Sequence, residues 1–128
     1  MIYVFDTHVL IWYFIGSKRL KRKLKERIEE VRNTGGRLLV PTIVIAEALA
    51  IAEKGKVEFD FQGMYQLIKD EPEFEIVGFT PEIMEEAMHT EIPEIHDRII
   101  VATAKFYRAG LLTKDKIILE SGEVEQLW

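Results

Sequence analysis

Four carboxylates stand in strongly apolar stretches of this sequence. Residues 43–52 read IVIAEALAIA, in which Glu47 is the one polar side chain. Asp6 follows the run IYVF, Asp97 lies in HDRIIVATA, and Asp115 lies in LLTKDKIIL. Moving an ionised carboxylate out of water without a partner costs several kcal/mol or more. Four such side chains therefore need a common reason to be where they are.

A shared divalent cation would supply that reason. Crowded carboxylates repel one another, and at least one pKa rises strongly unless a positive charge lies between them. Hard oxygen ligands suit Mg²⁺ or Mn²⁺. A site of this kind favours phosphoryl chemistry, because the ion polarises a phosphate oxygen and lowers the pKa of a bound water. No side-chain nucleophile is then required.

The apolar runs predict strands that alternate with helices. This alternation predicts an α/β fold, a three-layer α/β/α sandwich with a mostly parallel central sheet, formed by a single domain over residues 1–128. The predicted strands are 2–5, 37–40, 74–79, 111–113 and 116–119. The predicted helices are 7–15, 18–33 with Ser17 as its cap, 42–54, 60–69, 81–89 and 97–110.

This arrangement would bring the four carboxylates together. In open α/β sheets, ligands bind outside the carboxyl ends of the strands. Asp6 and Asp115 each follow a predicted strand, so they belong to that edge. Glu47 and Asp97 lie in the first turns of helices that would start at the same edge. We therefore expect the four side chains to converge.

Each carboxylate also has a purely structural explanation. Asp97 could cap its helix or interact favourably with the helix dipole, and Asp115 could be a turn residue between two strands. Glu47 could form a salt bridge, with Arg98 as its partner. Asp6 could simply end a buried strand. The sequence leaves these alternatives open for each residue taken singly.

Other residue types offer less chemistry. The histidines His8, His89 and His96 show no zinc spacing. His8 and His96 adjoin two of the carboxylates, which allows a role near a substrate, although surface or packing roles are the simpler interpretation. No serine or threonine lies in a hydrolase elbow motif. The segment TGGR matches no phosphate-binding loop, so binding of a nucleoside triphosphate is not expected.

The composition is that of an ordinary globular protein. Of 128 residues, 48% are apolar and 30% are charged. No apolar run approaches the ~20 residues of a membrane helix, and cysteine is absent, which fits a cytoplasmic chain without membrane attachment. The net charge of −5 argues against general affinity for nucleic acids, yet seven of the 17 basic residues lie between Lys18 and Arg27.

Two further segments have alternative interpretations. The basic stretch SKRLKRKLKER (17–27) is either a solvated helix face with its leucines inward or a surface that contacts RNA phosphates. The segment LIWYFIG (10–16) places Trp12, Tyr13 and Phe14 in one short helix. One face of a helix cannot bury all three rings, so part of this set could line a hydrophobic groove.

Together, the carboxylate motifs resemble the PIN-domain family, and within it the VapC-type toxins, the ribonuclease half of toxin–antitoxin pairs. VFDTHVLIW resembles the opening strand with its first Asp, and IAEALA the helix that carries the Glu. HDRIIVATA resembles the Asp-Arg helix, and LLTKDKII the final Thr-x-Asp. The resemblance spans residues 2–119. Family members often have an Asp-Pro shortly before the Asp-Arg pair, where this sequence reads IPEIHDR with Glu94 in place of the Asp.

The resemblance implies a metal-dependent endoribonuclease that hydrolyses RNA phosphodiester bonds with Mg²⁺ or Mn²⁺. It also implies an antitoxin protein as partner and a homodimer. The residues carried over as metal ligands and water activators are Asp6, Glu47, Asp97 and Asp115, with Thr113 and Arg98 in support.

Two other functions compete with this interpretation. A phospho-accepting receiver module is also an α/β domain with aspartates at strand ends, but it needs adjacent acids after its first strand. Here Asp6 stands between Phe5 and Thr7, which argues against a receiver. A catalytically inactive PIN-like binding scaffold is the third possibility, and the presence of all four acids argues against it.

Overall fold

The computed structural model describes all 128 residues and has a five-stranded sheet at its centre. The strand order is β3-β2-β1-β4-β5, and every neighbouring pair is parallel. The strands are β1 (Ile2–Phe5), β2 (Arg37–Pro41), β3 (Phe74–Val77), β4 (Gly110–Leu112) and β5 (Gln126–Leu127). The predicted α/β fold with a parallel sheet is therefore confirmed.

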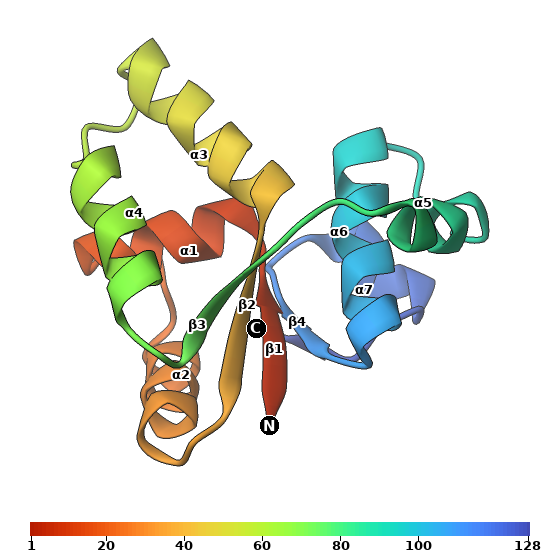
Figure 1. Cartoon of the computed structure of the whole chain (residues 1–128), viewed down its shortest axis with the longest axis horizontal. Helices are drawn as coiled ribbons and strands as arrows, with labels where there is room; N and C mark the ends of the chain where they lie inside the picture. The colour runs from red at the N-terminus through yellow and green to blue at the C-terminus, as the bar shows by residue number, and fades with distance from the viewer.

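Seven helices connect the strands and cover the sheet. Helices α1, α2 and α4 lie on one side of the strands, α5, α6 and α7 lie on the other, and α3 continues from the end of β2 (Figure 1). The helices are α1 (Thr7–Ile15), α2 (Arg22–Asn33), α3 (Thr42–Lys54), α4 (Phe61–Asp70), α5 (Pro81–Met88), α6 (Ile95–Tyr107) and α7 (Lys116–Ser121).

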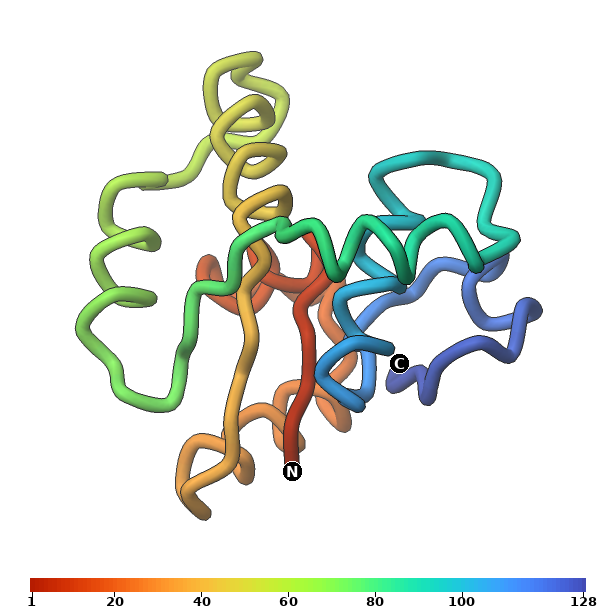
Figure 2. The backbone as a smooth tube through the Cα atoms, turned by 45° about the vertical axis from the view of Figure 1, so that its right-hand side comes forward, coloured from red at the N-terminus to blue at the C-terminus, as the bar shows by residue number.

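The order of the strands explains why the later helices lie on the other side of the sheet from the earlier ones. The chain adds β2 and then β3 on one flank of β1, and β4 and β5 on the other. After β3 the chain crosses the sheet before it enters α5 and α6, as Figures 1 and 2 both show. Because parallel crossovers are right-handed, reversing direction along the sheet moves the helices to the opposite face. None of the helices combines the length and apolarity needed to span a membrane.

The core lies around the central strand β1. Val4 and Phe5 have no exposed surface, and Val4 pairs with Leu39 of β2 and Leu111 of β4. Strands buried on both faces read as continuous apolar runs, which is why the sequence pattern identified these three strands. The same pairing holds the carboxyl ends of β1 and β4 side by side.

The first helix is apolar almost all round. Trp12 and Tyr13 are 5% and 8% exposed, whereas Phe14 is half-buried and Ile15 is 41% exposed. A helix with this pattern is enclosed by its neighbours rather than laid on a surface. Two of the three adjacent aromatic rings therefore enter the core.

The helix predicted over 18–33 is shorter than expected. It begins at Arg22, and Ser17 is not its cap; the Ser17 hydroxyl oxygen instead accepts a hydrogen bond from the Arg19 N–H at 3.1 Å. Gly16 ends α1 with a positive φ of 66° and turns the chain away. Several basic residues thus lie in a turn ahead of α2.

The strand predicted over 116–119 is wrong, because this segment is helix α7. Asp115 caps the helix: its Oδ1 accepts hydrogen bonds from the N–H groups of Ile117 and Ile118 at 2.8 and 3.0 Å. Ile118 is buried, whereas Ile117 and Leu119 are 56% and 60% exposed. A short apolar run is compatible with a strand or a helix, and here the Asp115 cap stabilises the helix. The last strand is β5, which was not predicted. The other predicted elements agree with the structure to within a few residues.

Gly110 is required where β4 meets β1. A Cβ atom at this position would lie 2.8 Å from a ring carbon of Tyr3, and the Tyr3 hydroxyl accepts a hydrogen bond from Arg27, which holds the ring in place. We expect Gly110→Ala to lower the free energy of unfolding by about 1–3 kcal/mol in urea titrations, because the strands must separate slightly. Gly78→Ala is the matched control, since no atom lies within 4 Å of its added Cβ. Equal stability of the two variants would contradict this packing.

Candidate active site

The carboxylates lie at the edge of the sheet where β1 and β4 end. Asp6 directly follows β1 and caps α1, and Asp115 lies beyond the end of β4 and caps α7. Glu47 is carried by α3, which starts from the end of β2, and Asp97 by the first turn of α6. Glu47 is the sixth residue of its helix, so its expected place in the first turn is wrong.

Asp6 is fixed by two threonines. Its Oδ1 accepts a hydrogen bond from the Thr7 N–H at 2.6 Å, and its Oδ2 accepts one from the Thr113 hydroxyl at 2.5 Å. Thr113 has no exposed surface, and the pairing of Phe5 with Leu112 places it opposite Asp6. The sheet register therefore sets the orientation of this carboxylate across 107 residues of chain.

Glu47 points towards the start of α1. Its Oε1 accepts a hydrogen bond from the Thr7 hydroxyl at 3.1 Å. Burial raises the pKa of Glu47, and the charge of Asp6 acts in the same direction, while the Thr7 hydrogen bond and His96 oppose the rise. The salt bridge to Arg98, which was the structural alternative for Glu47, is absent, and the Arg98 Nε donates to the Ile92 carbonyl oxygen at 2.8 Å.

Asp97 is not the cap of α6. That role belongs to Glu94, whose Oε2 accepts a hydrogen bond from the Asp97 N–H at 2.7 Å. Burial, followed by the charges of Asp115, Asp6, Glu94 and Glu47, raises the pKa of Asp97 to about 6. The charges that act on Asp97 are thus those of the other three candidate acids and of Glu94.

Asp115 has a structural role in addition to its place in this group. Its Oδ1 accepts the two backbone hydrogen bonds of the α7 cap, and its own N–H donates to the Thr113 hydroxyl at 3.1 Å. The interpretation of Asp115 as a turn residue between two strands is therefore wrong. The Thr113 hydroxyl donates to the Asp6 carboxylate and accepts from the Asp115 backbone N–H, so one buried hydroxyl joins Asp6 to the turn that carries Asp115.

No basic side chain neutralises this group of acids. None of the seven salt bridges of the structure includes any of the four carboxylates. His96 lies close to Glu94 instead, with its Nδ1 2.6 Å from Glu94 Oε1, a contact that raises the pKa of His96. His8 is exposed beside Trp12, and His89 is exposed at the end of α5.

The donor chemistry of the group fits a divalent cation. It offers carboxylate oxygens from four helices or their caps, and no salt bridge neutralises the charges that repel one another there. No set of three or more acidic or histidine side chains is already arranged to hold an ion. The carboxylates would therefore have to turn towards a common point to bind one.

Sequence reasoning missed two contributors to this region. Thr7 holds Glu47, and Glu94 caps α6 while adding to the charge around Asp97. Glu94 gave no capping signal, because Glu is not among the residue types that usually cap helices. The Thr7 contact gave no signal either, since it joins residues 40 positions apart.

The raised pKa of Asp97 has a consequence for stability. The folded state binds this proton more tightly than the unfolded state, whose pKa is near 3.8. Stability is therefore lost as the pH rises from about 4 to about 6. We expect Asp97→Asn, without metal at pH 7, to melt above the wild type by about 3–5 °C, which corresponds to about 1 kcal/mol after allowing for solvent screening.

The matched control for that variant is Asp60→Asn. Asp60 also stands at a helix start, where it caps α4 by accepting the Gly63 N–H, but it lies outside the carboxylate group. Asn caps as well as Asp, so this variant should leave the melting temperature and its pH dependence unchanged. A melting temperature of Asp97→Asn several degrees below that of the wild type would contradict the repulsion.

Comparison with known proteins adds a family and a set of similar folds. The family model described as PIN domain matches residues 3–123. None of the curated proteins compared with the chain matches it in sequence. Among solved structures, VapBC2 from Rickettsia felis, bound to a DNA fragment from its promoter, has a TM-score of 0.77 at 16% identity, covering 99% of this chain and 98% of that chain.

Two further structures are similar over nearly their whole length. FitAcB from Neisseria gonorrhoeae has a TM-score of 0.68 at 15% identity, covering 100% of this chain and 97% of that chain. VapC20 from Mycobacterium tuberculosis, a toxin that cleaves the sarcin-ricin loop, has a TM-score of 0.67 at 14% identity, covering 98% of each chain. These likenesses concern the fold, whereas the family model matches almost the entire sequence. The chain belongs to the PIN domain family.

Proposed function

We propose that this chain is a metal-dependent endoribonuclease that hydrolyses RNA phosphodiester bonds with Mg²⁺ or Mn²⁺. The observation that carries the proposal is the state of Asp97. Its pKa is raised to about 6 by burial and by surrounding carboxylates, and no Lys or Arg neutralises them. Such an arrangement is stable as a cation site and costly as anything else. Membership of the PIN domain family supports the same conclusion.

The residues proposed to hold the ion are Asp6, Glu47, Asp97 and Asp115. When bound, the ion polarises a phosphate oxygen, lowers the pKa of a bound water and stabilises the leaving oxygen. Asp6 is held ready by Thr113 and Thr7, so it needs little rearrangement.

Glu47 and Asp97 have a second task in this proposal. A carboxylate that lies beside the bound ion can also accept a proton from the attacking water, and these two side chains are the proposed acceptors. The Thr7 hydroxyl orients Glu47, and the first turn of α6 orients Asp97. In this account Arg98 supports the site only indirectly, by fastening the segment before α6 through Ile92.

We further propose that the enzyme is the toxin of a toxin–antitoxin pair, acts in the cytoplasm, forms a homodimer, and folds as one domain over residues 1–128. A toxin-antitoxin complex from Klebsiella pneumoniae is among the similar folds. Helices α5, α6 and α7 expose large apolar side chains, including Met88 at 62% and Leu119 at 60%, which a protein partner could cover. The receiver module remains disfavoured, because Asp6 has no acidic neighbour after β1.

The direct test is cleavage of a labelled RNA by the purified chain with and without Mn²⁺. We expect the wild type to cut RNA only when the metal is present. Asp6→Asn should reduce the rate by at least about 100-fold, because an amide replaces a charged metal ligand. Asp60→Asn, again an Asp-to-Asn change at a helix cap, should cut at the wild-type rate.

The outcomes separate the competing functions. Cleavage by Asp6→Asn at the wild-type rate would remove this residue from the site. A wild type that binds an antitoxin but never cuts RNA would favour the inactive scaffold. Thermal melts of each variant without metal establish that a lost rate is not lost folding.

A further inference from the structure

A pocket of about 320 Å³ opens where α1 ends and α2 begins. Trp12 and Tyr13 form part of its wall, and the turn at Gly16 and Ser17 forms another part. No acidic side chain lines it. The positively charged residues that line it are Lys18, Lys21, Arg22 and Lys25. Residues of the basic stretch (17–27) and of the aromatic segment (10–16) thus line the same pocket. Neither segment has a role in the proposed metal site.

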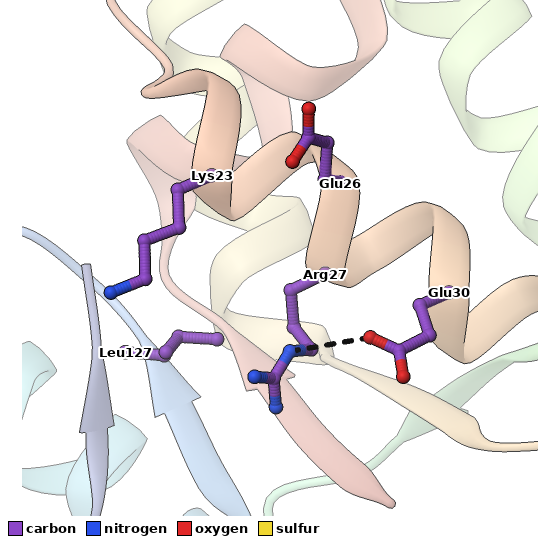
Figure 3. A pocket seen from close by; sticks show the side chains of 5 residues that line it. All are labelled: Lys23, Glu26, Arg27, Glu30 and Leu127. Atoms are coloured by element: carbon purple, nitrogen blue, oxygen red, sulfur yellow. Dashed lines mark ion pairs between the residues drawn. The ribbon is translucent and has the colours of Figure 1, made fainter.

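The opposite face of α2 has a different charge pattern. The pocket there is lined by Lys23, Arg27, Glu26, Glu30 and Leu127, so its charges cancel (Figure 3). Arg27 Nε and Glu30 Oε2 lie 3.6 Å apart in that pocket (Figure 3). Basic residues on that face are therefore poor candidates for binding an anion.

The lysines of the first pocket are not neutralised in this way. Lys18, Lys21 and Lys25 take part in no salt bridge, although Arg22 pairs with Glu26 at 3.2 Å on an exposed surface. In a chain of net charge −5, this is a local positive surface, bordered on α2 by a second pocket in which Arg22 and Lys25 meet Glu26, Glu29 and Glu30.

A line of cations and indole rings joins this pocket to the carboxylates. Lys21 Nζ lies 5.2 Å from the ring centroid of Trp128, and the Trp128 and Trp12 rings are 6.0 Å apart. Lys114 Nζ lies 4.8 Å from the Trp12 ring on the same indole pair. Lys114 is the residue between Thr113 and Asp115, so the line ends at the candidate active site.

We infer that this pocket binds the phosphates of a single RNA strand on one flank of the bond that is cut. The inference rests on the proposed function and extends it to the path of the substrate. Helix α1 advances about 1.5 Å per residue, so the turn at Gly16 lies roughly 15 Å from Asp6 along the helix. Phosphate contacts position a strand without reading its sequence. An acidic protein segment would meet the same charges, but it would gain nothing from a line that leads to the carboxylates.

The test measures RNA binding without cleavage. Binding of a fluorescent single-stranded RNA to the full chain is followed in EDTA over a range of salt concentrations, for the wild type and the double variant Lys21→Ala/Lys25→Ala. Loss of two phosphate contacts should reduce the slope of log K against log salt by about 1.4. Lys69→Ala is the matched control, because Lys69 also lies over an aromatic ring, that of Tyr65 at 5.4 Å, but on α4.

Each result decides the inference. A reduced slope for the double variant with an unchanged slope for Lys69→Ala supports it. Equal slopes for all three proteins, or no RNA binding by the wild type, would overturn it. Polyglutamate serves as a second probe, standing in for an acidic protein segment. If the double variant loses binding to polyglutamate while its RNA slope is unchanged, the inference is overturned and the pocket belongs to an acidic protein partner. The proposed function fails separately, if the wild type does not cleave RNA with Mn²⁺.

Discussion

Repulsion among carboxylates at one edge of the sheet is the constraint on which the rest of this structure depends. Asp97 experiences the charges of acids from three other elements, and burial prevents water from screening them fully. The parallel sheet provides the necessary rigidity, because the buried Thr113 holds Asp6 through the pairing of β1 with β4. Unneutralised repulsion of this kind lowers stability, and the proposed cation site would account for it.

The residues around the acids orient them without neutralising their charge. Threonines rather than arginines contact two of the carboxylates: the Thr113 hydroxyl and the Thr7 N–H donate to Asp6, and the Thr7 hydroxyl donates to Glu47. A hydroxyl orients a carboxylate without cancelling its charge, so the negative potential remains available to a cation. A cluster of basic residues lies apart from the acids, around the turn ahead of α2, where it can meet the opposite charge of a nucleic acid.

The sequence allowed most of the fold and the positions of the four acids to be predicted, for a physical reason. Buried parallel strands are continuous apolar runs, and residues at their carboxyl ends share one edge. What could not be predicted depends on contacts between distant residues or on competition between local signals. Glu47 binds Thr7 rather than Arg98, which only the packing of α3 against α1 determines. The segment 116–119 is apolar enough for a strand, but the Asp115 cap makes it a helix.

The most direct measurement is the pKa of the Asp97 side chain, followed by NMR in the folded protein with and without Mg²⁺. The account predicts a value of about 6 without the ion, since burial and the neighbouring acids disfavour the charged form. Adding Mg²⁺ should move the pKa down to the ordinary range of an aspartate or below it, because the cation replaces repulsion with attraction. An ordinary aspartate pKa that Mg²⁺ leaves unchanged would show that the four acids do not share one site.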